Sequence, residues 1–240
     1  MPHRQRHRGR HPDDHELFAP AALPALRRAV DELSWLRSRG YAEPAALKLV
    51  GDRHGLRERQ RRAVARCACT DLELATRASR RLASAELAGR PVVLDGFNCL
   101  ITVEAALSGG VILRGRDGVH RDLASVHGSY RRVAETRASI AALGDVLAEL
   151  GVREARWYLD RPISNSGTVA GLLRDEASRR GWDWQVELAT SPDKEIIAAT
   201  GSIGASSDGW ILNQCAAWID LPGEVIATRV PGAWIVDLAP

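Results

Sequence analysis

Four acidic residues each follow a run of apolar or small residues, where a buried strand would end. Asp95 closes PVVLD and Asp160 closes WYLD, while Asp193 follows ATSP and Asp208 follows GASS. Asp193 and Asp208 would each begin a helix, so capping of its first backbone amides is the alternative role for these two. Ligands of an open parallel sheet bind beyond the carboxyl ends of its strands, so these acids are expected to meet at one edge. Crowded carboxylates repel one another unless a cation or proton compensates, and hard oxygen ligands suit Mg²⁺ or Mn²⁺. The pattern therefore predicts a divalent metal site.

The chemistry of such a site would be nucleolytic. Paired divalent ions ~3.5–4 Å apart activate a water molecule and stabilise the leaving oxygen of a phosphodiester. The nucleotide-binding patterns GxGxxG and GxxxxGK[ST] do not occur, and the glycines of GSIGASSDG are wrongly spaced for either. The sequence thus disfavours an enzyme of dinucleotides or nucleoside triphosphates.

The elements that would position the acids begin after Gly89. Short runs rich in β-branched and aromatic residues alternate there with helical patterns, which indicates an α/β class with a mainly parallel sheet and crossover helices. The expected strands are PVVL, ARWYL, WQVEL, IGAS, AAWI, EVIAT and AWIVDL. The expected helices span residues 99–107, 121–150, 167–180, 193–200 and 208–215. Because the last strands come close together, a hairpin or meander is expected at the final edge of the sheet.

The chain is expected to divide into a basic disordered tail at residues 1–20, a helical basic domain at 21–90 and the α/β domain at 91–240. Residues 1–90 hold 19 of the 33 Lys and Arg and 11 of the 30 Asp and Glu, a net of +8, which leaves −5 for the remainder. A basic half suits a polyanion, with uneven helix surfaces as the alternative. Apolar residues three and four apart predict helices near 23–39, 44–50, 56–69 and 70–88.

An arginine-rich segment, GDRHGLRERQRRAVAR at residues 51–66, carries six arginines against two acids. Such density suits phosphate contacts, with Arg57 and Arg61 as substrate-binding candidates. A short helix and a glycine turn precede it, so it also resembles a helix-turn-helix whose second helix enters a major groove. A solvated face with its apolar residues toward the core is the third interpretation.

Two loops are further candidates for phosphate contacts. RPISNSG after Asp160 supplies Arg161, Ser164 and Asn165 just before a helix, where exposed amides and hydroxyls could hold a phosphate. A strand-to-helix turn capped by Ser or Asn is the alternative. RGRDGVHRD at residues 114–122 could guide a nucleic-acid strand or be a solvated connection.

Three ordered motifs resemble those of the PIN-like nucleases, especially their NYN branch. DGFN at residues 95–98 is similar to the Asp-Gly-Tyr-Asn type motif that ends a strand. SPDKEII at 191–197 is similar to the Ala-Asp-x-x-Ile type motif that opens a helix, and SSDGWIL at 206–212 to the Ser/Thr-x-Asp motif after the next strand. The resemblance covers roughly residues 91–215 and implies a PIN-like three-layer α/β/α domain.

The resemblance also implies roles for single residues. Asp95, Asp193 and Asp208 would bind Mg²⁺ or Mn²⁺, and Asp160 would complete the set of catalytic acids.

Other residues of the motifs have less direct roles. Asn98 would hold the first loop or touch substrate, and Ser206 joins the substrate-binding set. Glu104 is a candidate additional acid from the following helix, with solvation of an amphipathic helix as the alternative. Phe97 in place of Tyr and Pro192 in place of a small residue depart from the family pattern, so a retained fold without hydrolysis stays open.

The whole chain also resembles the domain-of-unknown-function family 434, in which a helical N-terminal domain precedes a PIN-like domain. HPDDHELF at residues 11–18 and ALKLVGDRHGLRERQRRAV at 46–64 carry this likeness. It implies a fold more firmly than an activity.

The observations predict a Mg²⁺- or Mn²⁺-dependent PIN/NYN-like endoribonuclease, with RNA favoured over DNA and the basic helical domain holding the nucleic acid. The rival function is a non-catalytic nucleic-acid-binding regulator that uses the helix-turn-helix-like segment and an inactive sheet domain. A third is a scaffold whose tryptophan-rich C-terminal strands mediate homo-oligomerisation. Trp157, Trp210, Trp218 and Trp234 are expected in the core.

The compartment follows from what the sequence lacks. No stretch approaches the ~20 apolar residues that span a bilayer, and the N-terminal segment has no apolar stretch of a secretory signal. Four cysteines in 240 residues do not make a disulfide framework. A soluble cytoplasmic protein is the simplest account.

Overall fold

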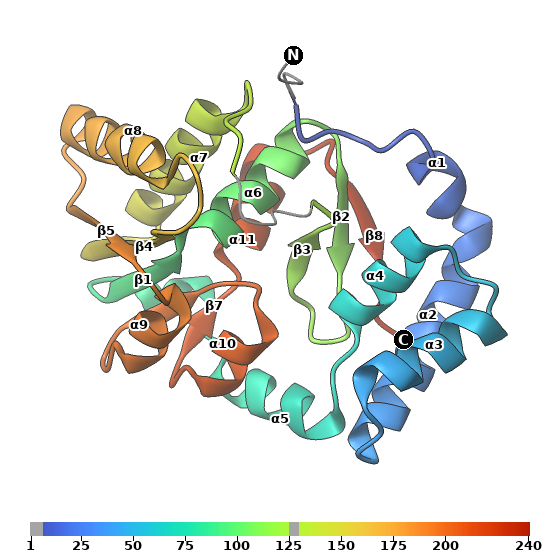
Figure 1. Ribbon diagram of the computed structural model, residues 1–240. Helices are drawn as coiled ribbons and strands as arrows, with labels where there is room; N and C mark the ends of the chain where they lie inside the picture. The colour runs from blue at the N-terminus through green and yellow to red at the C-terminus, as the bar shows by residue number, and fades with distance from the viewer. Residues whose placement is uncertain (1–6, 125–129) are drawn as a thin grey trace.

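The computed structural model describes residues 7–124 and 130–240, and Figure 1 shows helices arranged around two sheets. The larger sheet has the strand order β5-β4-β1-β6-β7, and every neighbouring pair in it is parallel. Its strands are β1 (Pro91–Asp95), β4 (Glu154–Asp160), β5 (Trp184–Ala189), β6 (Ile203–Ala205) and β7 (Trp218–Ile219). The expected α/β class with a mainly parallel sheet is therefore confirmed.

The strand order of the larger sheet reverses between β1 and β6. From β1 the chain moves outward to β4 and β5, then returns to β6 and β7 on the other side of β1. In open α/β sheets, ligands bind at such a reversal, beyond the carboxyl ends of the strands. Asp95 ends β1 here, and Leu94 pairs with Ala205 of β6. The chain after Ala205 therefore leaves the sheet beside Asp95.

Helices cover both faces of the larger sheet. Alternate residues of a strand point to opposite faces, so Val92 and Leu94 belong to one apolar cluster and Val93 to another. The first cluster is covered by α6 (Gly96–Leu107), α7 (Thr136–Glu149), α8 (Ser166–Arg180) and α11 (Leu221–Arg229), and the second by α9 (Pro192–Ala198) and α10 (Gly209–Gln214). This part of the protein thus has three layers.

The region before β1 is helical, as predicted. Its elements are α1 (Asp14–Leu17), α2 (Leu23–Ser38), α3 (Glu43–Arg53), α4 (Glu58–Cys67) and α5 (Asp71–Arg80), with 3₁₀ turns η1 (Pro20–Ala22) and η2 (Ser84–Leu87). Helix α5 ends well before the expected residue 88. The next residues turn extended because they meet the larger sheet, where the backbone N–H of Leu82 donates to the carbonyl of Trp218 at 2.9 Å.

A second sheet of three strands lies between the helical region and the larger sheet (Figure 1). Its strands are β2 (Val111–Arg114), β3 (His120–Asp122) and β8 (Trp234–Asp237), and β2 pairs antiparallel with β3 and parallel with β8. Val111 and Leu113 of β2 pack into the helical core, whereas Ile112 packs with Ile226 of α11. The small sheet therefore joins the two halves through both of its faces.

Three expectations about the later elements are wrong. EVIAT, expected as a strand, lies in α11, because Leu221 and Val225 face the core four residues apart and Asp220 caps the helix. Strand β8 joins the small sheet and makes no hairpin or meander with its neighbour. The helix expected at 121–150 begins only at Thr136, since β3 occupies its expected start.

The predicted boundary between a domain at 21–90 and another at 91–240 does not separate two cores. One apolar cluster contains Leu26 and Val30 of α2 together with Leu113 of β2 and Val236 of β8. The helical region is therefore completed by strands that come much later in the chain.

The segment at 1–20, expected to be a disordered tail, is ordered from residue 7, and residues 1–6 lie outside the described residues. Arg8 is buried and forms an ion pair with Glu104 of α6. Asp14 is fully buried against Arg59 of α4, with a nitrogen–oxygen distance of 2.5 Å. Phe18 packs into the helical core. Buried charge pairing and apolar contacts thus offset the cost of ordering this segment.

All four cysteines are free and buried. In the described part of the chain, no helix is both long enough and apolar enough to cross a membrane.

One buried carboxylate links the two halves of the molecule. Asp117, in the turn between β2 and β3, pairs with Arg77 of α5 at 2.6 Å and with Arg121 of β3 at 2.7 Å. Burial raises the pKa of Asp117, but the two guanidinium groups outweigh it and lower this pKa to about 2. Arg77 also donates to the carbonyl of Gly209, and Arg121 to the carbonyl of Ser207. The triad therefore fixes the loop that leads into α10.

We expect the Asp117→Asn substitution to destabilise the protein by about 3–5 kcal/mol, because it leaves two buried guanidinium groups without their counter-ion. Urea unfolding at pH 7 measures the loss. The depressed pKa means that the wild-type carboxylate stabilises the fold above pH 4 and loses this effect as the pH falls toward 2. The difference between variant and wild type should therefore shrink in that window.

The matched control for this prediction is Asp71→Asn. Asp71 pairs with Arg116 at 2.7 Å, but its side chain is 68% exposed, so solvent screens the pair. An unfolding midpoint as low for Asp71→Asn as for Asp117→Asn would contradict the assigned role of the buried triad.

Candidate active site

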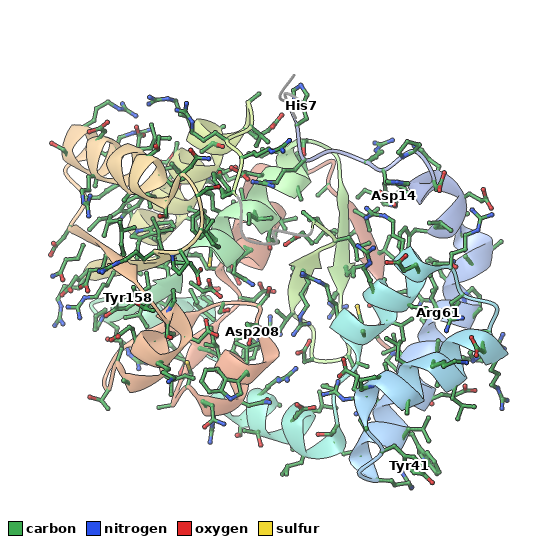
Figure 2. All side chains as sticks on the ribbon, in the orientation of Figure 1. His7, Asp14, Tyr41, Arg61, Tyr158 and Asp208 are labelled. Atoms are coloured by element: carbon green, nitrogen blue, oxygen red, sulfur yellow. The ribbon has the colours of Figure 1, made fainter. Side chains whose placement is uncertain are left out.

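A pocket of about 210 Å³ opens where the strand order of the larger sheet reverses. It is lined by Arg66, Asp95, Phe97, Asn98, Ile101, Asp122, Ala124, Asp160, Ile163, Asp193 and Asp208. All four acids that the sequence singled out therefore lie on one pocket, although they are separated by up to 113 positions in the chain. In Figure 2 the labelled Asp208 lies on the side of the larger sheet that faces the helical region.

Asp95 is held at the end of β1 by two hydrogen bonds. Its Oδ1 accepts from the backbone N–H of Asn98 at 3.4 Å and caps α6, while its Oδ2 accepts from the Ser206 hydroxyl at 2.8 Å. The turn requires glycine at position 96, because a Cβ there would lie 2.9 Å from the backbone carbonyl oxygen of Tyr158 and 2.6 Å from the Leu159 side chain. The Asp-Gly pair thus lets β1 pass directly into α6 while the carboxylate stays in the pocket.

The loop after β6 is locked to the first turn of α6. The Oδ1 of Asn98 accepts from both the backbone N–H and the hydroxyl of Ser207, each at 2.9 Å. The Ser206 hydroxyl accepts from the backbone N–H of Asp208 at 3.0 Å while it donates to Asp95. Ser206 is fully buried, so its predicted contact with substrate is wrong, and it instead positions two of the acids. Asn98, predicted to hold the first loop or to touch substrate, instead holds the loop after β6.

The other three predicted acids reach the pocket from different elements. Asp160 is the last residue of β4, and Asp193 lies in the first turn of α9. Asp208 caps α10, with its Oδ1 accepting from the backbone N–H groups of Trp210 at 2.8 Å and Ile211 at 3.3 Å. Asp208 therefore both caps α10 and lines the pocket, because the cap uses only one of its two carboxylate oxygens.

Two further residues of the lining were not predicted as part of the acidic site. Asp122 ends β3, and its carboxylate accepts from the Thr102 hydroxyl at 3.0 Å and from the backbone N–H of Ala124 at 2.7 Å. The rule that found the other acids, a carboxylate at a strand end, would have found Asp122 if β3 had been predicted. Arg66 of α4 brings a positive charge from the helical region, and only the packing of the two halves places it here.

The carboxylates of the pocket disfavour one another's ionisation. Burial raises the pKa of Asp95 to about 7, the Ser206 hydroxyl opposes this rise, and repulsion from Asp193, Asp208 and Asp160 adds to it. Burial and the charge of Asp193 raise the pKa of Asp160, while burial and the charge of Asp208 raise that of Asp193. Negative charge therefore accumulates without full compensation, which is the condition that a bound cation would relieve.

Carboxylate oxygens are the ligand type that hard divalent cations prefer. Within residues 7–124 and 130–240, no group of three or more His, Cys, Asp or Glu side chains is arranged to hold a metal ion together. Mg²⁺ is typically bound through one or two carboxylates and completes its shell with water and phosphate oxygens. The pocket offers carboxylates of this kind, but no closed cage.

Glu104 does not contribute to the pocket. Its carboxylate is fully buried elsewhere, where it pairs with Arg8 and accepts from the hydroxyls of Tyr130 and Thr136. Both predicted alternatives for Glu104, an additional acid and a solvated helix position, are therefore wrong. Its role is to anchor the N-terminal segment.

The loop after β4 has mainly structural contacts. Arg161 donates to the carbonyl of Leu188, and Asn165 adopts a left-handed φ of 69° and donates to the carbonyl of Tyr130. Ser164 is exposed and does not line the pocket. Only Ile163 of this loop reaches the lining among the described residues.

The arginines predicted to bind phosphate are mostly paired within the protein. Arg57 pairs with Glu16 at 2.9 Å, and Arg61 pairs with Asp52 at 2.8 Å. Figure 2 labels Arg61 among the N-terminal helices, far across the view from Asp208. These ion pairs offset the charges of Arg57 and Arg61, whereas Arg66 of the same segment lines the pocket.

Comparisons with known proteins give families without an assigned activity. The family model described as a domain of unknown function, DUF5616, matches residues 84–224. The model described as a protein of unknown function, DUF434, matches residues 25–80, which confirms the likeness to family 434 for that part alone. An uncharacterized protein of Methanocaldococcus jannaschii is 26% identical over 189 residues, which cover 77% of this chain and 90% of that protein. No solved structure matches the chain.

We expect Asp95→Asn to stabilise the metal-free protein at pH 8 by about 1–4 kcal/mol. A carboxyl group with a raised pKa favours the folded state while it is protonated, and this advantage is lost as the pH rises from about 4 through 7. In urea unfolding with EDTA present, the gain in the free energy of unfolding of Asp95→Asn over wild type should therefore grow between pH 4 and pH 7 and then level off. The same gain in Asp175→Asn, an exposed position of α8, would contradict this account.

Proposed function

The chain belongs to the family described as the domain of unknown function DUF5616, and we propose that it hydrolyses phosphodiester bonds in RNA with the help of Mg²⁺ or Mn²⁺. The observation that carries the proposal is the meeting of Asp95, Asp160, Asp193 and Asp208 on one pocket at the strand reversal. Carboxylates gathered in that number are costly to the fold unless they serve a cation, and burial and repulsion raise the pKa of Asp95, Asp160 and Asp193.

The motif resemblance supports the same activity. The three segments that resemble PIN-like nucleases of the NYN branch, DGFN, SPDKEII and SSDGWIL, each contribute an acid to the pocket. The larger sheet is parallel with helices on both faces, in keeping with the PIN-like three-layer fold that this resemblance implies. The preference for RNA over DNA rests on the resemblance.

One or two of the carboxylates of Asp95, Asp193 and Asp208 would bind the ion directly, and the others, with Asp122 in the same lining, would reach it through water molecules. A bound Mg²⁺ or Mn²⁺ ion would neutralise charge on the phosphate and activate a water for attack on phosphorus. Asp160 would accept a hydrogen bond from that water and orient it. Arg66 would offset the charge of the phosphate that enters beside the acids.

Nuclease assays with RNA and DNA oligonucleotides in Mn²⁺ and in Mg²⁺ test the proposal. We expect metal-dependent cleavage of RNA that EDTA abolishes. Asp95→Asn and Asp208→Asn should each lower the cleavage rate at least about 100-fold, because each removes charge that the reaction needs at the phosphate. Cleavage that persists at the wild-type rate in both variants would overturn the proposal.

The matched control replaces a carboxylate outside the pocket in the same way. Asp175 lies on the exposed surface of α8, so Asp175→Asn should retain the wild-type rate. Because Asp95→Asn is expected to be at least as stable as wild type, its loss of cleavage would not be explained by unfolding.

A further inference from the structure

A second cavity of about 500 Å³ adjoins the acidic pocket and shares Arg66, Asn98 and Asp208 with it. It lies between the helical region and the loop that leads into α10, where α5 and α10 are in contact. Four arginines contribute to its lining, against three acids: Arg37, Arg66, Arg77 and Arg121, against Glu43, Glu73 and Asp208. We call this second cavity the groove. A polymer lying along it would pass directly beside the acids of the pocket.

Arg66 is the arginine of the groove that is left for a ligand. Arg77 and Arg121 are buried and share Asp117, and Arg37 pairs with Glu43 and Glu73. Within the described chain, Arg66 has no hydrogen-bond or ion-pair partner and is exposed. Its guanidinium group therefore stands at the junction of the two cavities with its donors unused.

Trp210 presents a second unused surface in the same groove. Its side chain is 49% exposed, although the next two residues, Ile211 and Leu212, are fully buried. The prediction that Trp210 lies in the core is therefore wrong. No aromatic or cationic side chain of the described residues stacks on its ring. By contrast, Trp35 is 52% exposed on the helical region, but the guanidinium of Arg39 covers its ring at 3.7 Å.

We propose that this groove binds a nucleotide next to the cleaved phosphate of a single-stranded nucleic acid, with the base stacked on Trp210 and a phosphate on Arg66. Aromatic side chains bind single strands by stacking on unpaired bases, and a base within a duplex has no free face to offer. Guanidinium groups bind phosphate oxygens through paired donors. Cleavage of the neighbouring phosphate rests on the proposed nuclease function, whereas binding in the groove does not.

Binding is measured by fluorescence anisotropy of a labelled short single-stranded RNA in EDTA, so that no cleavage takes place. We expect Trp210→Leu to weaken binding about 10-fold or more, from loss of one base stack, and Trp210→Phe to retain most of the affinity. Arg66→Gln should weaken binding and reduce the slope of log affinity against log salt by about 1. Trp35→Leu, the matched control, should bind as wild type does.

Two further ligands sharpen the test. Duplex RNA of the same sequence should bind more weakly than the single strand and should be insensitive to Trp210→Leu. Single-stranded DNA shows whether the 2′-hydroxyl contributes, and sensitivity of either single strand to Trp210→Leu supports the groove.

The outcomes separate the groove from the nuclease proposal. If Trp210→Leu and Arg66→Gln weaken binding while no variant or wild type cleaves RNA, the groove stands and the nuclease function fails. If both variants, shown to be folded by circular dichroism, bind the single strands as tightly as wild type and Trp35→Leu do, the groove proposal is overturned, whatever the cleavage assays show.

Discussion

The arrangement of the two halves depends on the carboxylate of Asp117 and the two guanidinium groups that surround it. Arg77 comes from the helical region and Arg121 from the small sheet, and both also hold carbonyls of the loop that carries Asp208. Charges buried this deeply are costly unless they are paired, so the two halves can pack in this arrangement only if the three groups meet. The same contact that joins the halves therefore places an acid of the pocket and sets the groove beside it.

In the acidic pocket, unlike in the Asp117 triad, charges of the same sign lie close together. Its carboxylates gather with one arginine nearby, and burial together with mutual repulsion raises the pKa of Asp95 to about 7. Hydrogen bonds from Ser206 and from the first turn of α6 keep that carboxyl group in place despite the repulsion. A site that destabilises its own fold in this way is typical of a site maintained for binding or catalysis, and compensation comes from the packed layers around it.

Sequence patterns were most informative where local chemistry decides the structure. Apolar runs that end in an acid predicted β1 and β4 together with the placement of Asp95 and Asp160, because parallel strands deliver their carboxyl ends to one edge. The same reasoning failed for EVIAT, since β-branched residues also suit a buried helix face, and for Asp122, whose short strand β3 forms only against β2. Glu104 could not be placed either, because its partner Arg8 lies 96 positions away.

The sequence by itself determined the α/β class, the helical start of the chain and the four acids of the pocket, since each follows from hydrophobic period and strand ends within a short window. Tertiary structure alone decided which arginines remain unpaired, why Trp210 is exposed, and that α4 contributes Arg66 to a pocket built by the larger sheet. These features depend on contacts between residues far apart in the chain, and ion pairing and burial are properties of the packed neighbourhood. A residue's type and its local pattern carry no record of that neighbourhood.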